Sequence, residues 1–123
     1  MNHDNLKQRT KNYALRVIKV VEALPKTLTA RTIGDQLLRA GTWVGANYRA
    51  ARRAKSNADF ISKMGTVEEE ADESLYWMEL LIESGLMSAS KLSALMKEGD
   101  ELVAIVVASI NTARGKTRSR ERA

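Results

Sequence analysis

The sequence predicts an all-α protein with the architecture of an antiparallel up-down-up-down four-helix bundle. The 123 residues include one proline and 5% aromatic residues, while Ala, Leu, Glu, Lys and Arg are abundant, a composition that favours helices over strands. Apolar residues recur at steps of three and four in four segments. Because the connections between these segments are short, consecutive helices are expected to pack as antiparallel neighbours.

The first two helices are predicted over residues 5–24 and about 30–54. In the first, the apolar positions from Leu6 to Leu24 follow the helical period, and Pro25 stops the helix because it cannot donate a backbone hydrogen bond. In the second, Thr29 is the expected N-cap. The side chains expected to face the core of the bundle from the second helix are Ile33, Leu37, Ala40, Val44, Asn47 and Ala51.

The third and fourth helices are predicted over residues 58–84 and 90–113. Ser56 or Asn57 is positioned to cap the third helix, and Gly85 is expected to end it in the left-handed conformation that glycine adopts readily. Residues 1–113 therefore form the predicted bundle. The remaining residues, RGKTRSRERA at 114–123, contain no large apolar side chain that could anchor them, and we expect a disordered basic tail.

The second helix carries a stripe of glycines beside its apolar stripe. Gly34, Gly41 and Gly45 each cost about 1 kcal/mol relative to alanine inside a helix, so a compensating gain is expected. Their bare backbone allows another helix to approach closely, and that helix belongs either to the same bundle or to a second subunit. The residues predicted at such helix or subunit interfaces are Gly41, Gly45, Trp43, Asn47, Tyr48 and Trp77.

Asn47 occupies a predicted core position where Ile or Leu would be less costly to bury. A buried amide without partners costs about 1–3 kcal/mol. We therefore expect Asn47 to bond a neighbouring polar group, for which the acidic third helix offers candidates, and to fix the register between helices.

The net charge of +5 hides a strong segregation of charge along the chain. Residues 1–55 hold 12 Lys and Arg against 3 Asp and Glu, residues 56–113 hold 3 against 11, and residues 114–123 hold 5 against 1. A basic surface favours nucleic acid as a partner. Oppositely charged segments also suit contacts within one chain or between copies, so both interpretations stay open.

A dense group of basic residues stands at the end of the second helix. Positive side chains there interact favourably with the helix dipole, which explains one or two of them but not four. The excess suits either the phosphates of RNA or DNA or the acidic surface of a neighbouring copy. The residues predicted to face phosphates are Arg49, Arg52, Arg53 and Lys55, assisted by Arg118 and Arg120 of the tail.

The acidic run VEEEADES lies on the third helix, where Glu69 and Glu73 share one face and Glu70 is displaced by about 100°. A di-metal centre of the ferritin type needs Glu-x-x-His on two helices, and His3 is the single histidine of the sequence. We therefore expect a solvated or salt-bridged face. Its candidate partners on the second helix are Arg39, Arg49 and Arg52.

The side chains that most enzymes use are scarce in this sequence. It has no cysteine, one histidine, no glycine-rich phosphate loop and no metal-ligand spacing, so we expect no catalysis, no metal and no cofactor. No apolar run reaches the roughly 18 residues of a membrane span, and the lack of cysteine suits a reducing compartment. A soluble cytoplasmic protein without a membrane partner is therefore expected.

Residues 36–86 resemble a known protein family. The matching features are Gln-Leu-x-Arg-Ala from Gln36, Ala-Asn at 46–47, Ser-x-x-Asp-Phe from Ser56 and the Glu-rich stretch that follows. In these features the chain resembles the bacterial four-helix-bundle proteins encoded by intervening sequences within 23S ribosomal RNA genes, the ribosomal S23-like type. It departs from many members at 48–51, where Tyr-Arg-Ala-Ala stands in place of Ile-Ala-Glu-Gly, so no role of that acid transfers to this chain.

The resemblance implies a ring-like homopentamer of four-helix bundles for which no enzymatic activity is established. A related protein is the accessory subunit of diversity-generating retroelements, which works with a reverse transcriptase through a basic surface compatible with nucleic acid. The leading hypothesis is therefore a non-catalytic homo-oligomer, with a pentamer as the expected assembly, that binds RNA or DNA or serves as a scaffold. The alternative is an adaptor whose target is another protein, such as a polymerase or reverse transcriptase.

Overall fold

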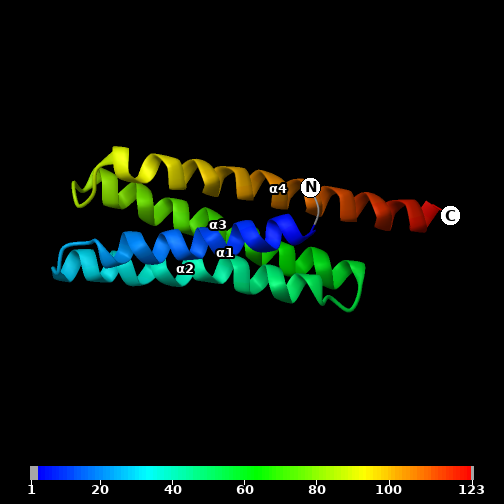
Figure 1. Ribbon diagram of the computed structural model, residues 1–123. Helices are drawn as coiled ribbons and strands as arrows, with labels where there is room; N and C mark the ends of the chain where they lie inside the picture. Colours follow the sequence, from blue (N-terminus) through cyan, green and yellow to red (C-terminus); the bar gives the residue numbers. More distant parts are fainter. Residues whose placement is uncertain (1–2, 123) are drawn as a thin grey trace.

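Four helices joined by short connections make up the structure (Figure 1). The computed structural model describes residues 3–122, and the side chains of residues 5–119. The helices are α1 (His3–Glu22), α2 (Leu28–Arg52), α3 (Asn57–Glu83) and α4 (Ala89–Arg122). The chain reverses direction at each connection, which confirms the predicted all-α antiparallel four-helix bundle. Among the helices described, none combines the length and the apolar character that crossing a membrane requires.

Hydroxyl caps and one glycine set the ends of the central helices. α2 begins after Thr27, whose hydroxyl accepts a hydrogen bond from the third backbone N–H of the helix (3.2 Å), so the N-cap is not the predicted Thr29. Ser56 caps α3 in the same way, with its hydroxyl oxygen 3.0 Å from the donating backbone nitrogen. Gly85 follows α3 with a φ of +79°, which confirms the predicted left-handed glycine.

α2 lies between two neighbours. It packs against α1 on one side and against α3 on the other, α3 also packs against α4, and α1 touches α4 only slightly. Fully burying a large apolar side chain stabilises the folded chain by about 1.5–3 kcal/mol. The largest side chains buried in the shared core are Tyr13, Leu37, Tyr48, Met64, Met78, Leu81, Leu92 and Leu102.

The glycine stripe of α2 faces α1. A Cβ atom at Gly41 would lie 2.7 Å from Val17 Cγ2, and one at Gly45 would lie 3.3 Å from Thr10 Oγ1. Gly34 faces the same helix nearer to its C-terminal end. Of the two neighbours that the sequence allowed, the structure thus places the glycines against a helix of the same bundle, where they let two backbones approach closely.

Asn47 lies at the edge of the core rather than within it. Its side chain is half-exposed and donates from Nδ2 to the carbonyl oxygen of Trp43 on its own helix (2.9 Å). After Val44, a step of either three or four residues fits the helical period, and the position that is buried is Tyr48, which is 1% exposed. The predicted burial of Asn47 is therefore wrong, because the arc that α2 buries is shifted toward its glycines.

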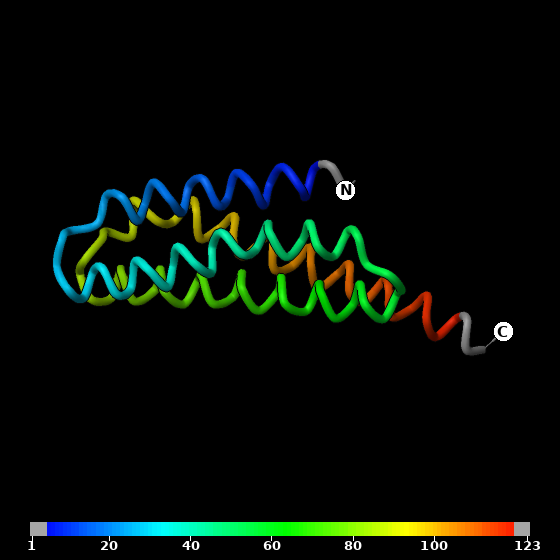
Figure 2. Tube along the Cα trace, turned by 90° about the horizontal axis from the view of Figure 1, so that it is seen from below, coloured from blue at the N-terminus to red at the C-terminus, as the bar shows by residue number. Residues whose placement is uncertain are grey.

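The helices end unevenly at the end of the bundle where α2 joins α3. α1 begins short of this connection, whereas α4 continues past it (Figure 1, Figure 2). Residues 114–122 continue α4 as helix, which differs from the expected disordered tail. Extending a helix that already exists needs no new nucleus, and lysine and arginine are good helix formers. Asn57 Nδ2 also donates to Ala113 O (2.7 Å) and to Thr117 Oγ1, which attaches this part of α4 to α3.

Candidate nucleic-acid interface

The C-terminal end of α2 presents three exposed arginines. Arg49, Arg52 and Arg53 are spaced by three and four residues from the first, so the helix places them on one side. Arg53 is also the C-cap, and its backbone N–H donates to Ala50 O (3.1 Å). Positive side chains are stabilising at this position because the carbonyl end of a helix carries a partial negative charge.

A fourth cation reaches this group from α1. Lys7, Arg49, Arg52 and Arg53 together line a pocket of about 260 Å³, here called the basic pocket. Antiparallel packing of α1 on α2 brings the start of one helix beside the end of the other. Sequence reasoning missed Lys7, although the antiparallel order of the first two helices is the signal that could have identified it.

The other basic residues predicted to face phosphates do not line the basic pocket. Lys55 is exposed in the connection between α2 and α3, and its backbone N–H donates to Asp59 Oδ2 (3.0 Å). Arg118 is exposed on the projecting part of α4, and the side chain of Arg120 lies outside the described residues. Lys116, which the sequence analysis did not single out, lines a groove beside the basic pocket.

Among the described residues near this end of the bundle, the carboxylate of Asp59 is paired with Lys63 and with the backbone of Lys55. Asp59 accepts a hydrogen bond from Lys63 Nζ (2.6 Å), and this bond, together with the Lys55 N–H, holds the pKa of Asp59 below its ordinary value. Within the part of the chain that the structure describes, no ion pair forms to Arg49 or Arg53. Their charge is therefore available to attract anions.

A larger groove adjoins the basic pocket and shares Arg52 with it. Its volume is about 1040 Å³, and it is lined by residues from all four helices and from the connection between α2 and α3. On α4 the lining residues run from Ile105 to Lys116, and on α1 the lining residue is Leu6, near the start of that helix. The groove therefore lies at the end of the bundle where α2 joins α3.

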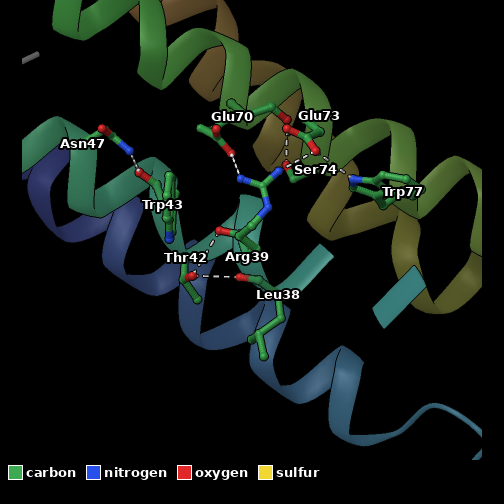
Figure 3. A network of polar contacts seen from close by, with 10 residues as sticks. Leu38, Arg39, Thr42, Trp43, Asn47, Glu70, Glu73, Ser74 and Trp77 are labelled. Carbon is green, nitrogen blue, oxygen red and sulfur yellow. Dashed lines mark hydrogen bonds and ion pairs between the residues drawn. The ribbon is translucent and has the colours of Figure 1, made fainter. Parts of the chain in front are cut away.

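The acidic run on α3 binds Arg39. Arg39 Nη2 donates to Glu73 Oε1 (2.6 Å), and its Nη1 lies 3.6 Å from Glu70 Oε2 (Figure 3). The side chain of Glu70 is 12% exposed, and burial raises its pKa, an effect that the charge of Arg39 partly offsets. Of the arginines predicted as partners of this run, Arg39 takes that role, and Arg49 forms no such pair with any residue described.

Two tryptophans contact this ion pair, Trp43 from α2 and Trp77 from α3. The Arg39 guanidinium lies 5.4 Å from the centre of the Trp43 ring, and Trp77 Nε1 donates to Glu73 Oε1 (3.3 Å; Figure 3). Trp43 is 49% exposed, and Tyr76, whose ring meets that of Trp77 edge-on, is 51% exposed. Trp43, Tyr76 and Trp77 are here called the aromatic face. Large exposed aromatic side chains of this kind are typical of protein–protein interfaces.

The carboxylates of α3 do not gather into a metal centre. In the described part of the chain, no group of three or more His, Cys, Asp and Glu side chains is placed to hold a metal ion. Glu70 and Glu73 are instead directed toward the positive charge of Arg39 (Figure 3). The acidic run therefore contributes an ion pair between α2 and α3.

Comparison with known proteins agrees with this architecture. The chain matches the 23S rRNA-intervening sequence protein family over residues 3–108. Its fold is similar to the crystal structure of a protein of unknown function from the S23 ribosomal protein family of Bacteroides thetaiotaomicron, with a TM-score of 0.84 and 30% sequence identity, over 90% of this chain and 99% of that chain. No curated protein matches the sequence at a significant level. The chain belongs to the 23S rRNA-intervening sequence protein family.

Proposed function

We propose that this protein binds RNA or DNA through its basic pocket and acts as a non-catalytic scaffold. The observation that carries the proposal is the convergence of Lys7, Arg49, Arg52 and Arg53 from two helices onto one small pocket. A cluster of positive charges binds a phosphate backbone because each contact releases condensed counterions. Guanidinium groups also offer paired N–H donors that match phosphate oxygens, which is the chemistry of anion binding rather than of acid–base catalysis.

The salt dependence of binding tests this proposal. At about 50 mM salt we expect the protein to bind generic RNA and duplex DNA, with log K falling by about 0.7–0.9 per phosphate contact for each unit of log salt concentration. A fluorescence titration over a salt series measures this slope. Failure to bind either nucleic acid at the lowest salt concentration would contradict the proposal, because phosphate contacts are strongest there.

Charge-reversal variants distinguish nucleic-acid binding at the basic pocket from binding through other cations of α2. The double variant Arg49→Glu, Arg53→Glu should weaken binding and reduce the salt slope by about 2, with the helical circular dichroism unchanged. Arg31→Glu is the matched control, because Arg31 is exposed near the opposite end of α2. If the double variant instead dissociates an oligomer, the basic pocket is a subunit interface and not a phosphate site.

We also propose that the protein assembles with copies of itself, and the family resemblance favours a pentamer. Support comes from the aromatic face, where Trp43 and Tyr76 each leave about half of their surface exposed in the single chain. Aromatic residues of this size are enriched at the centres of interfaces because they bury a large area at a small cost in side-chain entropy.

The aromatic face also favours a second candidate function, in which the protein is an adaptor for a nucleic-acid-processing enzyme such as a reverse transcriptase. In that case a different protein covers Trp43 and Tyr76. Affinity purification of the wild-type protein and of Trp43→Gln would compare the partners retained. Recovery of nucleic acid without any protein partner would count against the adaptor and in favour of direct binding.

A further inference from the structure

We propose that the nucleic acid bound here is single-stranded and that its bases enter the groove beside the basic pocket. This inference rests on the proposed nucleic-acid binding and specifies its substrate. The observation is a juxtaposition: a groove of about 1040 Å³ and the basic pocket of about 260 Å³ share Arg52. A duplex keeps the faces of its bases stacked inside the helix, whereas a single strand can turn them toward a protein surface.

The dimensions of the groove suit a short stretch of unpaired bases. Its wall on α4 extends from Ile105 to Lys116, which spans about 16 Å at the rise of an α-helix. Leu6, near the start of α1, lines the groove, and α4 extends past the start of α1 (Figure 1, Figure 2). Because the groove shares Arg52 with the basic pocket, a nucleotide chain bound at that pocket is next to the groove.

The groove offers apolar surface and one accessible aromatic ring. Phe60 and Ile105 are half-buried and Ala108 is exposed, so part of this apolar lining is in contact with water. A base that stacks on Phe60 removes both surfaces from water and needs no particular base identity. The hydroxyls of Ser109 and Thr112 also line the groove and can donate to or accept from base edges.

Positive charge lies on two sides of the groove. Arg52 contributes from α2 and Lys116 from α4, and none of the described residues that line the groove is acidic. An acidic amphipathic helix would also match an apolar groove with a basic rim. The continuity with the basic pocket favours nucleic acid instead, because a single strand carries a phosphate beside every base and can place phosphates in the cationic pocket while its bases enter the apolar groove.

A comparison of strandedness tests this inference separately from the proposed function. The probes are a fluorescent oligouridylate and the same strand paired with oligoadenylate. A length of about 12 nucleotides falls within the usual site sizes of single-strand-binding proteins. We expect the single strand to bind at least about fivefold more tightly, the effect of stacking one base. Equal affinity for both probes would overturn the inference and leave the proposed function intact, whereas binding of neither probe would remove both.

Filling the groove provides the second test. Ala108→Trp places an indole in the groove and should abolish the preference for the single strand while leaving duplex binding unchanged. Ala104→Trp is the matched control, because Ala104 is exposed one turn earlier on α4 and does not line the groove. Both positions are exposed, so circular dichroism should show both variants folded. If Ala108→Trp keeps the preference, the bases bind elsewhere and the inference is wrong.

Two further substitutions divide the contributions of stacking and charge. Phe60→Leu keeps an apolar side chain but removes the ring, and should lower single-strand affinity at least about fivefold without changing duplex affinity. Lys116→Gln should weaken single-strand binding more than Arg114→Gln, which removes the same charge from an exposed residue outside the groove lining. If these variants affect an acidic helical peptide and not the oligouridylate, the groove binds protein and the inference is overturned.

Discussion

The glycines of this protein differ in what their missing side chains achieve. A Cβ atom at Gly41 would lie 2.7 Å from Val17 Cγ2, whereas one at Gly65, within α3, would meet nothing within 4 Å. Gly41 therefore lowers helix propensity in exchange for close packing against α1. Gly65 carries the same cost in propensity without a packing contact in the single chain.

Alanine substitutions separate these two effects. Gly65→Ala should raise the free energy of unfolding by about 0.5–1 kcal/mol, because alanine loses less backbone entropy than glycine in a helix. Gly41→Ala gains the same propensity but must displace Val17, and we expect it to be destabilised by about 1–3 kcal/mol, as is typical of overpacked cores. Urea denaturation compares the two variants. Equal stabilisation by both would show that α1 moves away at no cost.

A buried tyrosine makes the stability of the bundle sensitive to alkaline pH. The hydroxyl of Tyr13 lies 2.8 Å from Ser74 Oγ, and burial raises the pKa of Tyr13 from 10.0 to about 12. Since the pKa is higher in the folded chain than in the unfolded chain, the stabilisation is fully present below about pH 10 and is lost as the pH rises toward 12.

The corresponding measurement compares the wild-type protein with Tyr13→Phe between about pH 9 and 12. Over this range the wild-type protein should lose about 2–3 kcal/mol of unfolding free energy relative to the variant, the equivalent of a shift of two pKa units. Lysines titrate in both proteins and cancel in the comparison. Parallel pH profiles would contradict burial of an un-ionised Tyr13.

The helices also differ in how the rest of the bundle holds them. α2 has neighbours on two sides, whereas α1 depends on α2 and touches α4 only slightly. The part of α4 that continues past the bundle is attached through Asn57, whose Nδ2 donates to Ala113 O and Thr117 Oγ1. These two contacts come from the first residue of α3, so the start of one helix stabilises the extension of another.

Removing this attachment should loosen the extension without affecting the bundle. In Asn57→Ala, we expect backbone amides at 114–119 to exchange with deuterium several-fold faster, because this part of α4 loses the two side-chain hydrogen bonds that attach it to α3. Ser56→Ala is the control, since it removes the N-cap of α3 and about 1 kcal/mol of stability but leaves these bonds in place. Unchanged exchange in Asn57→Ala would mean that propensity alone maintains the extension.

Over the whole bundle, charge is separated in space as well as along the chain. The basic pocket lies where α2 ends, and the acidic run lies on α3 beside the aromatic face. Arg39 and an ion pair between Arg9 and Glu98 (2.6 Å) neutralise part of the negative charge within the chain. The single chain thus leaves a cationic end and an aromatic face accessible, and these are the surfaces that the two proposals use.

The mass of the protein in solution tests whether the aromatic face is a subunit interface. Light scattering at physiological salt should show an oligomer for the wild-type protein and a smaller mass for the double variant Trp43→Gln, Tyr76→Gln, because both side chains are about half exposed in the single chain. Leu28→Gln is the control, as Leu28 is 77% exposed at the start of α2, away from the aromatic face. A monomeric wild-type protein would contradict self-assembly.

Local patterns in the sequence were sufficient to predict the helices. They were not sufficient to predict which residues lie next to a given side chain in the folded chain. Gly85 and the helical period predicted the end of α3 and the antiparallel bundle, because both depend on residues close in sequence. Asn47 and Tyr48 fit the same period one residue apart, and sequence periodicity could not select between them. Lys7 was missed because its relevance comes from α2, which is distant in sequence.

The amino-acid order by itself determined four antiparallel helices and the concentration of cations at the end of the second, since periodicity, breakers and charge are local properties of the chain. Only the tertiary structure decided that the glycines face α1, that Lys7 completes the basic pocket, that α4 continues past the bundle and that a groove opens beside it. These features depend on the relative lengths and close packing of helices that lie far apart along the chain, which no local pattern encodes.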